Sequence, residues 1–243
     1  MGYGDSLMLT AEAREVKRAI GIPATPSYWD DQIFDGNPNL AKEGGMPLRN
    51  TINNRPYHLG AVRTQYGTKV IFNPNFRAVP GEIYGIKKTT PSKHWVVIEP
   101  HFKPELFGAN KDWGWEKYRK LVDLLPNHFI QMSDNPNAEL LSENVHFRHT
   151  PTFRDAIRHL ASAKLYIGPE GGLHHAAAAL GIPAVVIFGG HTSPKTTGYD
   201  MHINLASDDA GCGNMFPCDH CRKAMDEITV EMVIEAAEKL LGE

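Results

Sequence analysis

A turn rich in glycine and histidine lies in the C-terminal half of the sequence and has the composition of a phosphate-binding loop. It reads Gly168-Pro169-Glu170-Gly171-Gly172-Leu173-His174-His175; an apolar run precedes it, and four alanines, Leu180 and Gly181 follow it. Adjacent glycines let the backbone approach a ligand closely, and the first N–H groups of the following helix then point at that ligand. The turn could therefore hold a diphosphate, although glycine turns between a strand and a helix that bind nothing are also common.

A second group of residues, near the C-terminus, has the chemistry of metal ligands. Three thiols and one imidazole occur within ten positions, at Cys212, Cys218, His220 and Cys221. Such a set of four ligands suits tetrahedral Zn or Fe and predicts a structural metal site. The spacing fits no standard zinc finger, however, and cysteine side chains are often simply buried, so both interpretations stay open.

Positive charge is concentrated between residues 44 and 98. Glu82 is the only acid in this segment, which has a net charge of +7, whereas the whole chain carries −3. Tyrosines and phenylalanines are interleaved with the basic residues, which are Arg49, Arg55, Arg63, Lys69, Arg77, Lys87, Lys88 and Lys93. This pattern is typical of a surface that binds an anionic partner. We expect Arg49, Arg55, Arg63, Lys87 and Lys88 to contact that partner, unless the segment is only a solvated face that aids solubility.

Length and composition exclude several classes of protein. The chain has 243 residues, of which 42% are hydrophobic and 22% charged, a balance typical of one large or two small globular domains. No apolar run approaches the length of a membrane span, and the N-terminus lacks the pattern of a signal peptide. An odd number of cysteines, three, argues against a disulfide framework. We therefore expect a cytoplasmic protein without a transmembrane segment.

The elements that must position these residues change in character near Lys93. Before it, the pattern predicts a first helix capped by Asp5 or Ser6, and then a loop-rich region with strands only at 69–73 and 82–86. After it, strands and amphipathic helices alternate, which predicts a parallel, doubly wound, Rossmann-like sheet over residues 94–243. Residues 1–93 would form a smaller domain. Ligands bind at the carboxyl ends of such strands, where the glycine turn must lie.

These motifs together resemble those of glycosyltransferase family 9, the heptosyltransferase group. The segment from Glu170 to Gly181, followed by Val186-Ile187-Phe188-Gly189, is similar to the donor-site signature of the family: Asp-Thr-Gly-Leu-Ser-His, a small-residue helix and a strand ending in Phe-Gly. Gly4-Asp5 is similar to the family's opening Gly-Asp turn, and Lys111-Asp112-Trp113 is similar to its Lys-x-Trp segment. Cys218 and Cys221 resemble the cysteine-containing tail that often leads into its last helix.

The resemblance implies a fold and a chemistry. The family fold is GT-B, with two Rossmann-like domains around a cleft, and the N-terminal acceptor domain is expected to be reduced here. The family transfers a sugar from a nucleotide diphosphate sugar with inversion and without an obligatory catalytic metal. By position, Asp5 would be the base that takes a proton from the acceptor hydroxyl, although it could instead only cap the helix. Lys111 would neutralise the diphosphate leaving group.

The same resemblance implies the residues that bind the donor, with departures from the family pattern. They are Lys111, Glu170, Gly171, Gly172, His174 and His175. Glu170 replaces the family's Asp and Gly171 its Thr, so the reach of the carboxylate and the donors to phosphate both differ. His174 stands where the family usually has Ser, and either histidine could be a supporting residue instead. The identity of the donor stays open.

Three classes of function fit these observations. The first is an inverting glycosyltransferase with an anionic acceptor: a glycolipid of the lipopolysaccharide type or, alternatively, viral DNA with hydroxymethylated pyrimidines, which would have to be flipped out. The second is a sugar-nucleotide epimerase, which shares the fold but matches the signature less well. The third is a non-catalytic nucleotide-sugar binding module, which would need the glycine turn but not Asp5. We favour the glycosyltransferase with a glycolipid acceptor, because the resemblance is to that group.

Overall fold

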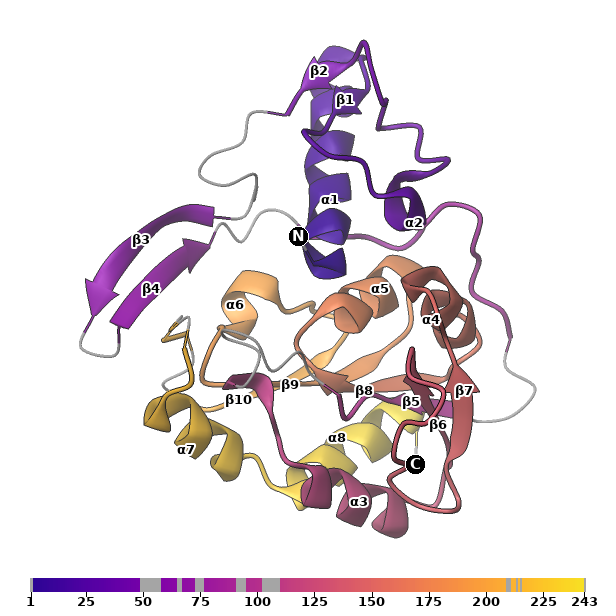
Figure 1. The fold of residues 1–243 in the computed structure, drawn as a ribbon, viewed down its shortest axis with the longest axis vertical. Helices are drawn as coiled ribbons and strands as arrows, with labels where there is room; N and C mark the ends of the chain where they lie inside the picture. Colours follow the sequence, from indigo (N-terminus) through magenta and orange to yellow (C-terminus); the bar gives the residue numbers. More distant parts are fainter. Residues whose placement is uncertain are drawn as a thin grey trace.

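A six-stranded parallel sheet forms the centre of the computed structural model, which describes residues 2–48, 58–64, 67–72, 77–90, 95–101, 110–208, 211–212, 214 and 216–242 (Figure 1). Its strands are β5 (Trp95–Ile98), β6 (His128–Ser133), β7 (His146–His149), β8 (Leu165–Pro169), β9 (Ala184–Gly189) and β10 (Ile203–Ala206). They lie in the order β10-β9-β8-β5-β6-β7, and every neighbouring pair is parallel. The order reverses between β5 and β8, as in Rossmann sheets, so the predicted doubly wound α/β class is confirmed.

Helices cover both faces of the sheet (Figure 1). One face carries α4 (Phe153–Leu160), α5 (Gly172–Leu180) and the short α6 (Pro194–Thr197); the other carries α3 (Trp115–Leu124), α7 (Asp219–Glu227) and α8 (Val230–Leu241). Side chains of each strand alternate between the two cores: Val97 lies in the first, whereas Val96 and Ile98 lie in the second. Within the part of the chain that the structure describes, none of the helices has the length and apolar character of a membrane span.

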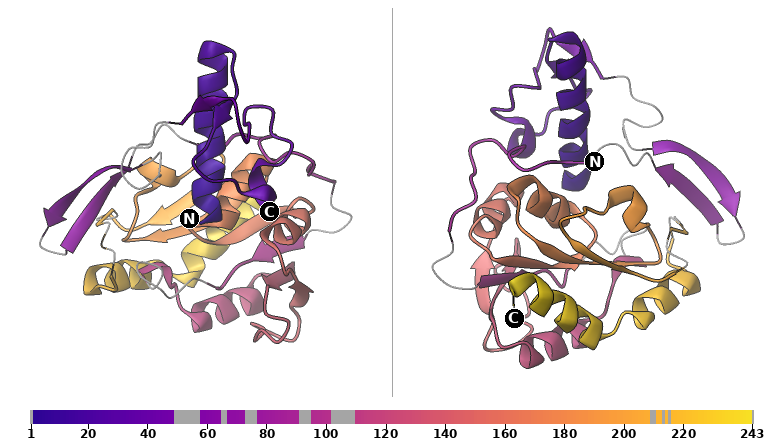
Figure 2. Two further views of the ribbon diagram at one scale, coloured as in Figure 1. Left: turned by 45° about the horizontal axis from the view of Figure 1, so that its top comes forward. Right: turned by 180° about the vertical axis from the view of Figure 1, so that it is seen from behind.

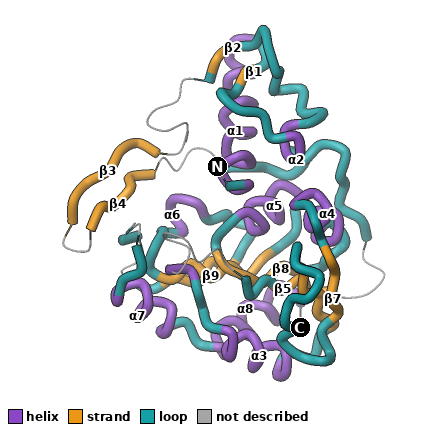
Figure 3. Tube along the Cα trace, in the orientation of Figure 1, coloured by secondary structure: helices purple, strands orange, loops and turns teal. Residues whose placement is uncertain are grey.

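The N-terminal part of the chain packs on the face that carries α5. The helix α1 (Tyr3–Ile20) stands with its N-terminal end against α5 and its other end away from the sheet (Figure 1). Beside it lie β1 (Ala24–Thr25), α2 (Asp31–Phe34) and β2 (Met46–Pro47), and loops make up much of this region (Figure 3). An antiparallel hairpin of β3 (His58–Thr64) and β4 (Gly67–Phe72) projects away from the body of the molecule (Figure 2).

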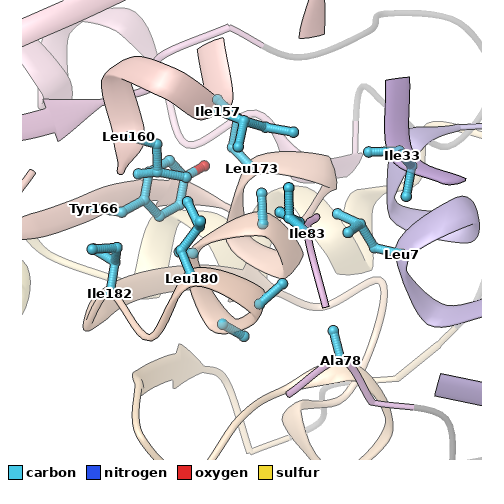
Figure 4. Close-up of a cluster of buried hydrophobic side chains, with 14 of the residues drawn as sticks. Leu7, Ile33, Ala78, Ile83, Ile157, Leu160, Tyr166, Leu173, Leu180 and Ile182 are labelled. Carbon is cyan, nitrogen blue, oxygen red and sulfur yellow. The ribbon is translucent and has the colours of Figure 1, made fainter. Parts of the chain in front are cut away.

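The N-terminal elements share one hydrophobic core with the sheet. Leu7 of α1 is 0% exposed and belongs to the same buried cluster as Ile157 of α4 and Leu173 of α5 (Figure 4). Ile33 of α2 and Ile83 complete this contact. The domain boundary at residue 93 stays a prediction, and the core is continuous across it.

Two local predictions about the N-terminal part were wrong. Residues 82–86 form a turn and not a strand, because Gly81 and Gly85 take positive φ angles of 96° and 76°. The first helix begins at Tyr3, ahead of the predicted cap. Asp5 lies in the first turn, where its carboxylate accepts the N–H of Gly2 at 2.7 Å, while the Ser6 hydroxyl turns away from the helix end and donates to a neighbouring carboxylate.

Shortening Leu7 is expected to destabilise the whole protein. Leu7→Ala should lower the free energy of unfolding by about 2–5 kcal/mol, because it leaves a cavity in the shared core. Ile20 lies at the outer end of the same helix and is 44% exposed, so Ile20→Ala is the matched control and should change the free energy by less than about 0.5 kcal/mol. Denaturant unfolding measures both values. If both variants changed the free energy of unfolding equally, α1 would not unfold cooperatively with the sheet.

Candidate active site

The glycine turn joins β8 to α5 at the carboxyl edge of the sheet, as predicted. It borders the point where the strand order reverses: a Cβ on Gly168 would lie 2.9 Å from the Cβ of Glu99, the residue that follows β5. Gly171 is extended, with φ 170° and ψ −162°, and a Cβ there would meet no atom of the described residues within 4 Å. The turn lies at the place where doubly wound sheets bind their ligands.

Glu99 is a carboxyl group at this edge that the motifs did not reveal. Burial raises the pKa of Glu99 to about 8; the hydrogen bond from the N–H of His101 (3.0 Å) opposes the shift, and the charge of Asp134 adds to it. At neutral pH most Glu99 side chains are therefore protonated. The residue adds little negative charge beside a turn that is suited to an anion.

The first turn of α5 presents backbone N–H groups for which the helix itself provides no acceptor, those of Gly172, Leu173 and His174. The N–H of Gly171 is not among them, because it lies 3.2 Å from Nδ1 of His174. Nε2 of His174 lies 2.9 Å from the carbonyl of Thr197, so Nε2 carries the proton and Nδ1 accepts. Burial is the main cause that holds the pKa of His174 well below its usual range, which keeps this supporting ring neutral.

A buried cluster of charges lies beside the turn. Nζ of Lys111 pairs with one oxygen of Glu170, and Nε2 of His175 lies 3.6 Å from the other. The side chains of Lys111 and Glu170 are only 15% and 9% exposed. Burial alone would raise the pKa of Glu170, but the ammonium of Lys111, followed by His175, holds that pKa well below its usual range. The structure thus brings Lys111, Glu170 and His175, three of the residues predicted to bind the donor, into one cluster with Glu170 ionised.

The first turn of α1 meets the first turn of α5. A Cβ on Gly4 would lie only 2.9 Å from Cδ2 of His175 and 3.7 Å from the carbonyl carbon of Gly171, so only glycine fits at this contact. Asp5 follows directly and is half-buried. The predicted base and the predicted diphosphate turn, which are far apart in the sequence, are therefore neighbours.

Gly172 has a packing role in the same contact. A Cβ there would lie 3.2 Å from the ring of Phe153 and 3.3 Å from Cβ of Tyr3. These two rings stack at a centroid distance of 4.1 Å, with 3° between their planes. Gly172 thus lets α4 and α1 close over the start of α5.

The four predicted metal ligands lie together beyond the carboxyl end of β9. The ligand atoms of Cys212, Cys218, His220 and Cys221 all lie within 4.8 Å of one another. Sγ of Cys212 is 3.2 Å from Sγ of Cys221, which is 3.9 Å from Nδ1 of His220. Bonds of about 2.3 Å at tetrahedral angles would place two sulfur ligands about 3.8 Å apart. The set therefore has the chemistry of a tetrahedral Zn or Fe site and is gathered closely enough to hold one ion, with Cys212 and Cys221 slightly closer together than in that geometry.

Asn110 connects this cysteine cluster to the turn. Its side-chain amide donates to the carbonyls of Asn214 (3.1 Å) and Phe216 (2.8 Å), and its oxygen accepts the N–H of Cys218 (3.1 Å). Asn110 is 3% exposed and directly precedes Lys111. Nothing in the sequence singles it out except that position.

Of the basic residues expected to bind the acceptor, the three that the structure describes do not join this group. Lys88 donates to the carbonyl of the C-cap residue of α5 at 2.9 Å, at the opposite end of the helix from the glycine turn. Lys87 is exposed beside it, and Arg63 is exposed on the β3–β4 hairpin. Arg49 and Arg55 lie outside the described residues.

Comparison with known proteins identifies the family and the type of fold. The profile of glycosyltransferase family 9 (heptosyltransferase) matches residues 86–229, more than half of the chain, while no curated protein sequence matches. The iron-containing dodecameric glycosyltransferase TibC from enterotoxigenic E. coli H10407 has 16% identity and a TM-score of 0.63, over 100% of this chain and 76% of TibC. E. coli heptosyltransferase WaaC, solved with ADP-2-deoxy-2-fluoro heptose, has 20% identity and a TM-score of 0.48, over 62% of this chain and 45% of WaaC.

The chain thus spans less than half the length of WaaC, and its similarity to TibC supports the GT-B type of fold. The resemblance inferred from the glycine turn is confirmed by the family profile, which covers that turn and Lys111. The chain belongs to glycosyltransferase family 9, the heptosyltransferase family.

Proposed function

We propose that this chain is an inverting glycosyltransferase that moves a sugar from a nucleotide diphosphate sugar to a hydroxyl group of an anionic acceptor. The observation that carries the proposal is the contact of two helix N-termini: α5 presents the amides of the glycine turn, and α1 presents Asp5 directly after Gly4. A module that only binds a nucleotide sugar would need the first and not the second. TibC has been solved with ADP-D-beta-D-heptose, which makes ADP-heptose the first donor to test.

In the proposed reaction, the acceptor oxygen attacks the anomeric carbon of the donor from the side opposite the diphosphate. Asp5 takes the proton of that hydroxyl as the new C–O bond forms. The bond from the anomeric carbon to the diphosphate oxygen breaks, and the nucleoside diphosphate leaves with the electron pair. The negative charge that develops on it is stabilised by the first-turn amides of α5 and by Lys111.

The anionic acceptor is proposed from the net charge of +7 over residues 44–98. A glycolipid of the lipopolysaccharide type is the acceptor to test first, and DNA with hydroxymethylated pyrimidines is the comparison. Arg49, Arg55, Arg63, Lys87 and Lys88 remain the candidate contacts. Because the described members of this set lie apart from the glycine turn, they would bind parts of the acceptor distant from the reacting hydroxyl.

We also propose that Cys212, Cys218, His220 and Cys221 hold a structural Zn or Fe ion, as their spacing fits tetrahedral coordination. TibC is described as iron-containing. A bound ion would cross-link the start of α7 to the segment after β10. Through Asn110 it would steady the backbone next to Lys111.

Gly171→Val tests the diphosphate turn. The extended backbone of Gly171 accepts a valine and its Cβ meets no atom of the residues that the structure describes, so the variant should fold with a Tm close to that of the wild type. The new side chain would occupy the space of the diphosphate and should weaken ADP binding by about tenfold or more, which corresponds to about 1.4 kcal/mol. Calorimetric titration with ADP measures this. Ala19→Val, on the exposed end of α1, is the control. Unchanged affinity in Gly171→Val would show that ADP does not bind at the turn.

Asp5→Asn tests the proposed base. The amide oxygen of asparagine still accepts the N–H of Gly2, so the helix end should be preserved and the affinity for ADP unchanged. Transfer should fall by about a hundredfold or more, the usual effect of losing a general base. The assay follows ADP release from ADP-heptose with the phosphorylated glycolipid and with hydroxymethylated DNA.

Asp31→Asn, on an exposed carboxylate of α2, is the matched control and should transfer at the wild-type rate. If Asp5→Asn also transferred at that rate, Asp5 would be a helix cap and no more.

The metal proposal predicts about one equivalent of Zn or Fe per purified chain. Cys221→Ser should lower the metal content and the Tm together, because a thiolate ligand is lost. His128→Asn, on an exposed histidine far from the cysteines in the fold, should retain the metal. Elemental analysis by mass spectrometry gives the metal content, and a wild-type chain without either metal would refute the site.

A further inference from the structure

The charged cluster beside the glycine turn continues into the interior through Tyr199. This residue follows α6 and is 6% exposed. Its hydroxyl oxygen lies 2.7 Å from Nδ1 of His175 and 3.3 Å from the backbone nitrogen of Ala78. Since a backbone N–H only donates, the hydroxyl accepts from Ala78, and its own proton can be donated to Nδ1. This arrangement corresponds to the tautomer of His175 with the proton on Nε2, the nitrogen that faces Glu170.

The contacts of Glu170 are compatible with this tautomer. Ionised Glu170 has no proton to donate, so it accepts from Lys111 at one oxygen, and its other oxygen lies 3.6 Å from Nε2 of His175, an electrostatic contact longer than a hydrogen bond. Tyr199 thus contacts His175, His175 faces Glu170, and Glu170 holds Lys111. We call these four residues the tyrosine relay.

Packing fixes the tyrosine at the head of the relay. Its ring lies edge-on to His174 and His175, at centroid distances of 5.3 Å and 5.6 Å. The segment that supplies Ala78 is itself held against the sheet domain, because the N–H of Gly81 donates to a carbonyl of α5 at 2.8 Å. The hydroxyl of Tyr199 therefore has little freedom to choose other partners.

We propose that Tyr199 is a positioning residue for the donor: its hydroxyl sets the tautomer of His175, His175 orients Glu170, and Glu170 holds Lys111 at the glycine turn. The inference rests on the proposed donor role of Lys111. It adds a residue that lies outside the motif of the turn, and it connects the N-terminal segment at Ala78 to the donor site. A tyrosine that merely fills the core would have no effect on Lys111.

Tyr199→Phe tests the relay, because it keeps the ring and removes only the hydroxyl. The affinity for ADP should fall about fivefold to tenfold, as is typical when one buried hydrogen bond is lost. Glu170→Gln should weaken ADP binding as well, because a neutral amide no longer fixes Lys111. The double variant should bind no more weakly than Glu170→Gln alone, since the hydroxyl acts through that carboxylate.

Tyr118→Phe is the matched control. Tyr118 is 1% exposed in the core on the opposite face of the sheet, and its buried hydroxyl has no hydrogen-bond partner within the described ranges. Its removal should leave the affinity for ADP at the wild-type value. Equal losses in Tyr118→Phe and Tyr199→Phe would mean that any buried tyrosine hydroxyl matters, and the relay would be wrong.

A measurement on the wild-type protein keeps the proposal testable even if Tyr199→Phe does not fold. The ¹⁵N chemical shifts of the His175 ring, assigned by their loss in His175→Gln, should report a proton on Nε2 and none on Nδ1 at neutral pH. In Tyr199→Phe that preference should weaken. The opposite tautomer in the wild-type protein would overturn the relay.

These results separate the relay from the proposed function. If wild-type protein binds ADP and Lys111→Met weakens it, while Tyr199→Phe binds like the wild type, the relay is wrong and the donor site stands. If wild-type protein does not bind ADP, the donor assignment is wrong, and the relay's role in donor binding is wrong with it. The relay is supported when all three variants weaken ADP binding, the double variant is non-additive and Nε2 carries the proton.

Discussion

The close contact between the first turns of α1 and α5 determines how the rest of the site is arranged. The ring of His175 fills the space that any side chain at position 4 would need. Because Gly4 has none, two helix N-termini come together, and each carries the positive end of a helix dipole. Two positive helix ends repel each other unless negative charge lies between or beside them. Asp5 and Glu170 supply that charge, and a bound diphosphate would add more.

The pairing of Lys111 with Glu170 prepares the cation before any ligand arrives. Taking both charges out of water is costly, and only good geometry with further hydrogen bonds makes such a pair acceptable. His175 lies 3.6 Å from the second carboxylate oxygen and stabilises its charge, and Asn110 anchors the backbone at the neighbouring position. A lysine already held in place loses little conformational freedom when an anion binds, so more of the electrostatic attraction appears as affinity.

The sheet could be predicted from the sequence, because strands buried on both faces are nearly continuous apolar runs. The start of α4 could also be predicted, because Thr152 and Asp155 form the expected capping pair. Helix α7 could not be predicted, since only Cys221, Ala224 and Met225 are buried along it and the apolar pattern is weak. The motif located Lys111 and Glu170, but 59 positions separate them and no local pattern states that they pair. Tyr199 was missed for the same reason, because its partners come from distant segments.

The position of α1 in the shared core also sets the order in which the chain can fold. This helix is synthesised well before its partner, because α5 begins about 150 residues after α1 ends. At ribosomal rates of about 5–20 residues per second, Leu7 and Leu9 wait about 8–30 s for that partner. Joining two elements so distant along the chain also requires closure of a long loop, which is slow. Helix α1 therefore docks long after it is made, and until then its apolar stripe has to be kept from other surfaces in the cell.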